Sequence, residues 1–104
     1  MFEFIEAPIF TKIVERYLSD DDYANLQNYL NEHPRAGNVI RGSGGVRKLR
    51  WSIQGRGKRG GVRIIYYFKA SRGHIWMLTL YAKNVKETIS AQILKQIKEA
   101  IENE

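Results

Sequence analysis

The most informative absence in this 104-residue sequence is that of acidic residues from its middle. Between Glu32 and Glu87 there are thirteen lysines and arginines and no aspartate or glutamate, whereas acids outnumber cations in both flanking segments. The net charge of +6 therefore understates the contrast. A solvated surface normally mixes both signs, so a block of one sign predicts a polyanionic partner such as nucleic acid or a membrane surface. A basic surface kept for solubility alone is the weaker alternative.

Cysteine is also absent, which excludes a disulfide framework and a thiolate zinc site. No apolar run approaches the roughly 20 residues that a membrane helix requires. The first ten residues, MFEFIEAPIF, carry acids where a secretory signal peptide needs cations. These absences predict a soluble cytoplasmic protein without a membrane partner, in which residues 1–104 form a single domain.

Groups that commonly serve hydrolases are scarce as well. His33 and His74 are the two histidines, and they do not form a pair at metal-ligand spacing. The confinement of the acids to the two ends of the chain argues against carboxylate-dyad hydrolysis and two-metal phosphoryl transfer. Gly55, Gly57 and Gly60 match G-x-G-x-x-G, but a strand-like run follows them where a dinucleotide site needs a helix. We expect neither a metal nor a cofactor.

Hydrophobic periodicity predicts an α+β fold with a small twisted antiparallel sheet. After a short strand at Phe2–Ile5, helical spacing predicts a helical hairpin made of Pro8–Leu18 and a second helix that Ser19 caps and that stops before Pro34. Residues 34–45 have the composition of a loop. The remaining elements are a meander of three strands, from Val46, over Arg63–Lys69 and over 74–82, and a final helix with a stripe of Ile89, Ile93, Ile97 and Ile101.

The strand that begins at Val46 alternates between apolar and cationic side chains. One face carries Leu49, Trp51 and Ile53, and the other carries Lys48, Arg50 and Ser52. Trp51, Tyr66 or Tyr67 could stack on a base if exposed, although core packing is the more common fate of such aromatics. The pattern predicts a half-buried strand with one cationic face.

Cations, hydroxyls and amides without acids suit one reaction in particular. RNA is cleaved when its own 2′-hydroxyl attacks the adjacent phosphate, and an enzyme then supplies in-line positioning and positive charge around the developing phosphorane. Arginine grips two phosphate oxygens with its planar fork, and a lysine crowded by other cations can exchange a proton near neutral pH. Glycines in the loop let the backbone approach a sugar-phosphate chain closely.

The order of the elements and three segments of sequence resemble the RelE/HigB toxin family, and within it the HigB-like branch. These segments are GGVRKLR at 44–50, GKRGGVRIIYYF at 57–68 and LTLYAKN at 78–84. The resemblance implies a RelE-like fold and a type II toxin that cleaves mRNA in the ribosomal A site without a metal ion, thereby inhibiting translation. It also implies two sets of partners: the ribosome with its mRNA, and a cognate antitoxin, which we expect to be a small helix-turn-helix protein.

The resemblance assigns candidate catalytic residues by position. Lys48 and Arg50 match the cations of the second strand, Arg63 matches the arginine that opens the third, and Lys83 matches the cation that ends the fourth. We expect Arg63 to stabilise transition-state charge and Lys83 or Lys48 to transfer protons. The candidates for gripping the RNA backbone are Arg47, Arg56, Lys58 and Arg59.

Two positions depart from better-studied RelE-type members. Asn84 stands where those members have an arginine, and no tyrosine follows Tyr81 where they have a catalytic tyrosine near the C-terminus. The general base is therefore left open among Lys83, Lys48 and Lys58. The missing tyrosine favours the alternative function, a non-catalytic RNA-binding module of the same fold. A DNA-binding protein is a weaker hypothesis, because none of the expected helices carries a cationic face.

Overall fold

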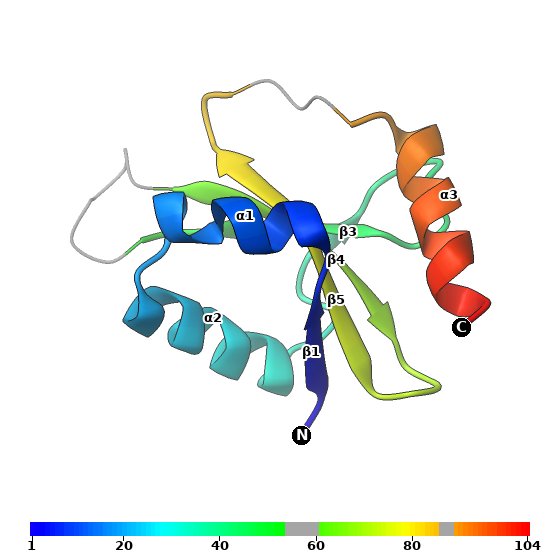
Figure 1. Ribbon diagram of the computed structural model, residues 1–104, viewed down its shortest axis with the longest axis horizontal. Helices are drawn as coiled ribbons and strands as arrows, with labels where there is room; N and C mark the ends of the chain where they lie inside the picture. The colour runs from blue at the N-terminus through cyan, green and yellow to red at the C-terminus, as the bar shows by residue number, and fades with distance from the viewer. Residues whose placement is uncertain (54–60, 86–88) are drawn as a thin grey trace.

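The computed structural model describes residues 1–53, 61–85 and 89–104, which form three helices and one five-stranded sheet (Figure 1). The α+β class predicted from periodicity is confirmed. The elements follow one another as β1 (Glu3–Glu6), α1 (Pro8–Tyr17), α2 (Asp20–Glu32), β2 (Asn38–Val39), β3 (Arg47–Trp51), β4 (Val62–Lys69), β5 (His74–Ala82) and α3 (Ala91–Glu102).

The sheet is mixed, with the strand order β1-β5-β4-β3-β2. Strands β2 to β5 pair antiparallel as the predicted meander requires, but β1 pairs parallel with β5, Glu3 opposite His74. The long connection from β1 to β5 permits this parallel pairing, which a tight turn would forbid. The predicted loop 34–45 also contains the short edge strand β2, because Asn38 and Val39 pair with Lys48 and Arg47.

The helical hairpin begins and turns where the sequence predicted. Pro8 occupies the start of α1, where its missing N–H costs nothing. Ser19 forms a capping box with Asp22, which satisfies backbone donors at the start of α2. Leu18, predicted as the last residue of the first helix, is the extended C-cap and is buried. This abrupt change to extended backbone folds α2 back after α1.

Helix α3 packs through a stripe that differs from the predicted one. Ser90 caps it, accepting a hydrogen bond from the Ile93 amide at 3.2 Å. Leu94 and Ile101 are its buried residues, whereas Ile93, predicted to face the core, is 46% exposed. The reason is geometric: steps of four residues advance about 40° around a helix, so Ile93 lies off the face on which Ile97 and Ile101 pack.

Side chains of β4 alternate between two apolar clusters, one on each face of the sheet. Ile64 and Tyr66 join the cluster formed with α1 and α2, while Ile65 and Tyr67 join the cluster formed with α3. Lys69, at the end of β4, is buried and donates from Nζ to the Ile101 carbonyl at 2.7 Å. This hydrogen bond fixes α3 over one part of one face of the sheet. The rest of that face is not covered by α3.

Candidate active site

Three neighbouring strands bring Arg50, Arg63 and Tyr81 into one row. Arg50 on β3 is the cross-strand partner of Arg63 on β4, and Arg63 is in turn the partner of Tyr81 on β5. Directly opposed residues of an antiparallel sheet project to the same face, with Cβ atoms about 4.5–5.5 Å apart. Arg50 is exposed, and Arg63 and Tyr81 are half-buried, so the row reaches solvent.

The next row on the same face consists of Lys48, Ile65 and Thr79, because residues two apart on a strand point to the same side. Ile65 is buried in the cluster under α3, whereas Lys48 and Thr79 are half-buried. This row marks the border between the part of the face that α3 covers and the open part that holds Arg50 and Arg63.

Lys83 extends the open part at the end of β5. Its amide donates to the Gly61 carbonyl at 3.1 Å, which continues the pairing of β4 with β5 beyond the regular strands. A Cβ placed on Gly61 would lie 3.5 Å from Cδ of Lys83, so the stem of the lysine lies over the glycine. We call the set Lys48, Arg50, Arg63, Tyr81 and Lys83 the basic face.

A β-bulge between β4 and β5 separates the basic face from the covered half. Ile65 pairs with Thr79, but its neighbour Tyr66 pairs with Met77, so Leu78 is the extra residue. Leu78 is buried in the cluster under α3. A bulge increases local twist and redirects the side chains that follow it. Tyr81 still packs against this cluster, so the row of Arg63 and Tyr81 lies at the border of the apolar contacts of α3.

The basic face carries charge of one sign. Four of its five members are cations, and Arg50 and Arg63 oppose each other directly across two strands. Like charges in this arrangement destabilise a sheet, and their summed field attracts anions to the surface between them. The arrangement is chemically suited to hold a phosphate that both guanidinium groups approach from one side.

Of the eight residues predicted for the site, four lie on the basic face: Lys48, Arg50, Arg63 and Lys83. Arg56, Lys58 and Arg59 lie outside the described residues. Arg47 alternates with Lys48 and therefore points to the opposite face. Its Nη1 donates to the carbonyls of Arg35 at 3.1 Å and Gly37 at 2.7 Å, so this guanidinium holds the turn between α2 and β2.

Tyr81 is the member of the basic face that sequence reasoning did not select. The signal was present as the spacing of Tyr81 and Lys83, two residues apart on a strand, but the apolar character of residues 74–82 concealed it. Tyr66 and Tyr67 are core residues, the outcome that the sequence favoured over base stacking, with Tyr66 fully buried and Tyr67 9% exposed. Trp51 is half-buried and packs against Tyr29, with ring centroids 5.3 Å apart.

The buried tyrosines serve the fold. Burial raises the pKa of Tyr66, whose hydroxyl accepts from the Gly37 amide at 3.0 Å and donates to the Pro34 carbonyl at 2.9 Å. Burial, followed by a hydrogen bond to Glu102 and the charge of that carboxylate, raises the pKa of Tyr67 to about 12. Both hydroxyls are therefore neutral at physiological pH and join separate elements of the fold.

Two negative findings apply to the described part of the chain. No three histidine, aspartate or glutamate side chains gather there in a way that would hold a metal ion. No helix there combines the length and apolar character that crossing a membrane demands.

The fold and the basic face together define a small α+β protein suited to contact a polyanion. Residues 11–103 match the family model described as the RelE toxin of the RelE / RelB toxin-antitoxin system. The chain therefore belongs to the RelE toxin family. It is a toxin of a toxin–antitoxin system with an antitoxin as its partner, and toxins of this family are typically endoribonucleases. Its place in the HigB-like branch stays a prediction.

Proposed function

We propose that this toxin is a ribosome-dependent endoribonuclease that cleaves mRNA in the A site and so inhibits translation in the cytoplasm. Membership of the RelE family supports the class of reaction. The observation that carries the proposal is the row of Arg50, Arg63 and Tyr81 on an open face of the sheet. Rigid strands hold the backbones of these residues, so their side chains start from fixed positions, as electrostatic catalysis requires.

The proposed reaction is transfer of the phosphate within the RNA strand. The 2′-oxygen of one nucleotide forms a bond to the adjacent phosphorus while the bond from phosphorus to the 5′-oxygen breaks. The 2′-hydroxyl loses a proton and the leaving 5′-oxygen gains one. The products are a 2′,3′-cyclic phosphate and a 5′-hydroxyl, and no water or metal ion is consumed in this step.

The roles follow from the chemistry of the side chains. Arg63 and Arg50 stabilise the charge that develops on the phosphorane oxygens, because guanidinium groups remain protonated and bind two oxygens at once. Lys48 or Lys83 takes part in proton transfer, and the hydroxyl of Tyr81 is a second candidate because it belongs to the same row as Arg63. The reaction on these groups proceeds without a metal ion.

Binding to the ribosome extends beyond the basic face in this proposal. Arg56, Lys58 and Arg59 contribute by charge to the grip on ribosomal and messenger RNA backbone, with affinity that falls as salt rises. The toxin's own partner is a cognate antitoxin, proposed to be a small helix-turn-helix protein.

Mapping of mRNA ends on purified ribosomes tests this function. Added toxin should produce cuts within the codon in the A site, with 2′,3′-cyclic phosphate ends, and activity should survive chelation of metals other than ribosomal magnesium. The alternative function is a non-catalytic RNA-binding module, favoured by the lack of a tyrosine after Tyr81. Ribosome binding that blocks translation without any new mRNA end would support that alternative.

A further inference from the structure

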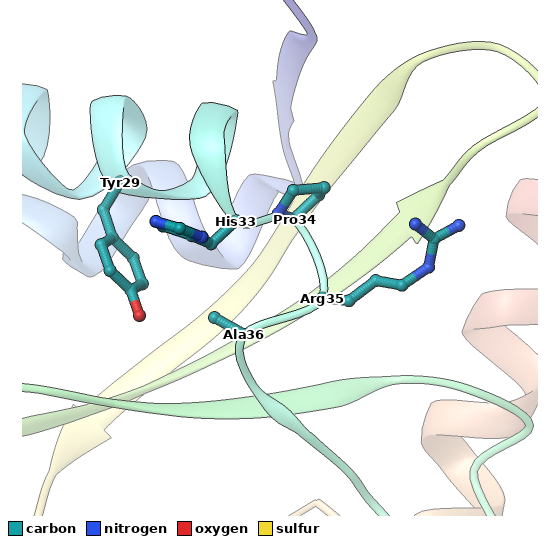
Figure 2. A pocket seen from close by; sticks show the side chains of 5 residues that line it. All are labelled: Tyr29, His33, Pro34, Arg35 and Ala36. Atoms are coloured by element: carbon teal, nitrogen blue, oxygen red, sulfur yellow. The ribbon is translucent and has the colours of Figure 1, made fainter.

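A hollow of about 380 Å³ lies between the last turn of α2 and the turn that leads to β2. Five residues line it: Tyr29, His33, Pro34, Arg35 and Ala36 (Figure 2). The hollow belongs to the same side of the sheet as α2, whereas the basic face lies on the opposite side. It is therefore separate from the site described above.

Two aromatic rings form one wall of the hollow. Tyr29 and His33 are four residues apart, so they lie one above the other on the same side of α2, with ring centroids 5.0 Å apart. Neither ring is enclosed, since Tyr29 is 38% exposed and the His33 side chain is 57% exposed. Figure 2 shows both rings beside the hollow, whereas the side chain of Arg35 extends away from them and its guanidinium lies over Phe68.

Two side-chain hydrogen bonds, one partly buried and one exposed, hold the backbone of the opposite wall. The Tyr66 hydroxyl donates to the Pro34 carbonyl, and Arg47 donates to the Arg35 carbonyl. Gly37 is required where the turn passes β3, because a Cβ there would lie 3.0 Å from the backbone of Lys48. These contacts preorganise the backbone of this wall, which lowers the entropic cost of binding a ligand.

We propose that this hollow binds a nucleobase of the RNA strand whose phosphates lie on the basic face. Exposed aromatic rings next to cationic groups are the recurring platform for unpaired bases, which stack on them regardless of sequence. Arg35 lines the hollow and the guanidinium of Arg47 holds the turn beside it, so the positive charge that attracts an RNA backbone lies next to the rings. The inference deepens the proposed function, on which it rests, by naming a base-binding subsite.

The border of the sheet connects the hollow with the basic face. Within the described chain, β2 pairs only with Arg47 and Lys48. At Arg50 and Trp51, β3 is therefore the edge strand of the sheet. Arg50 points to the basic face, and Trp51 points to the other side, where it packs against Tyr29. A flexible single strand that contacts Arg50 with a phosphate can pass around this border and place a following base against Tyr29.

The experiment compares two labelled hexamers, hexauridine RNA and a ribose-phosphate hexamer without bases, by fluorescence anisotropy at one salt concentration. The wild-type protein should bind the RNA about 5- to 150-fold more tightly than the abasic hexamer, the range expected for one stacked base. His33→Ala and Tyr29→Leu should bring this ratio close to one and leave the affinity for the abasic hexamer unchanged. Arg50→Gln is the matched control, which should weaken binding of both hexamers equally.

His33 is exposed, so its alanine variant should fold normally, and melting temperatures verify this for both variants. An unchanged ratio in the two folded variants would overturn the subsite. So would loss of antitoxin binding without any change in the ratio, because the hollow would then belong to the antitoxin interface. A wild-type ratio near one together with A-site cleavage would overturn the subsite alone. A ratio that depends on Tyr29 in a protein that cuts no mRNA would contradict only the enzymatic function.

Discussion

Arg50 and Arg63 oppose each other across β3 and β4, and Arg50 is exposed while Arg63 is half-buried. A directly opposed like-charge pair destabilises a sheet by roughly 0.2–1 kcal/mol. We therefore expect Arg50→Gln to raise the free energy of unfolding at low salt while it lowers toxicity. Inorganic phosphate should raise the melting temperature of the wild type more than that of the variant. Equal shifts in both proteins would contradict a shared anion site.

Arg63→Ala is expected to abolish toxicity and leave the melting temperature nearly unchanged. Loss of one preorganised contact to a transition-state charge costs about 3–4 kcal/mol, or 10²–10³ in rate. Arg63→Lys should restore part of the activity, because a point charge replaces the planar fork. Arg72→Ala is the matched control, since it removes the same charge from an exposed position at the other end of the β4–β5 hairpin. If the Arg63→Ala protein melts at a lower temperature yet still cuts A-site mRNA, Arg63 stabilises the fold and does not act in catalysis.

Tyr81→Phe tests the hydroxyl that sequence reasoning did not select. The ring keeps its place among the side chains packed around α3, so the fold should hold. If the phenol exchanges a proton during cleavage, single-turnover cleavage on the ribosome should slow by about 10²–10⁴-fold while ribosome binding is unchanged. A cleavage rate within twofold of the wild type would remove Tyr81 from the chemistry and leave proton transfer to the lysines.

Lys69→Met should destabilise the protein. The substitution removes the Nζ donor to the Ile101 carbonyl at the C-terminal end of α3, which then keeps the Glu104 amide as donor, and loss of one such hydrogen bond costs about 0.5–1.5 kcal/mol. Urea denaturation measures the loss. Lys12→Met, at an exposed position of α1, is the control and should change the free energy of unfolding little. Equal effects of the two substitutions would show that α3 does not depend on this contact.

Stability should fall as the pH rises above 10. The pKa of Tyr67 is about 12 in the folded protein and about 10 in the unfolded chain. Between pH 10 and 12 the folded protein therefore keeps the proton of the Tyr67 hydroxyl, which the unfolded chain loses. The contribution is fully present below pH 10 and is lost as the pH rises through 12. The raised pKa values of Tyr23 and Tyr66 act in the same direction. In Tyr67→Phe the unfolding free energy should depend less steeply on pH between 10 and 12, and an unchanged slope would contradict this account.

The sequence predicted the parts of the fold that depend on local rules. Ser19 and Pro8 mark helix starts through capping and backbone chemistry, and alternation along β3 placed Lys48 and Arg50 on one face. What it could not predict depends on pairing between distant segments. The parallel addition of β1 and the bulge at Leu78 are set by contacts that leave no periodic trace.

The same distinction, between local sequence and the pairing of distant segments, explains which residues of the candidate site were predicted. Arg63 and Lys83 were selected because the resemblance to the RelE/HigB family assigns cations to these strand ends. Tyr81 was missed because its role as a neighbour of Arg63 exists only once β4 and β5 are in register. Arg47 was predicted to bind the RNA backbone, but its position on β3 places its side chain on the opposite face, where its guanidinium donates to the carbonyls of the α2–β2 turn.

The parallel pairing of β1 with β5 has a consequence for synthesis of the protein. Glu3 and Phe4 leave the ribosome well before their strand partners, His74 and Ile75, which lie much later in the sequence. Emerging residues fold only with segments that have already left the exit tunnel, so β1 waits unpaired until the β4–β5 hairpin emerges. Arg63 and Tyr81 also come into register only at that stage. A nascent toxin therefore cannot assemble its basic face until β5 has left the ribosome that makes it.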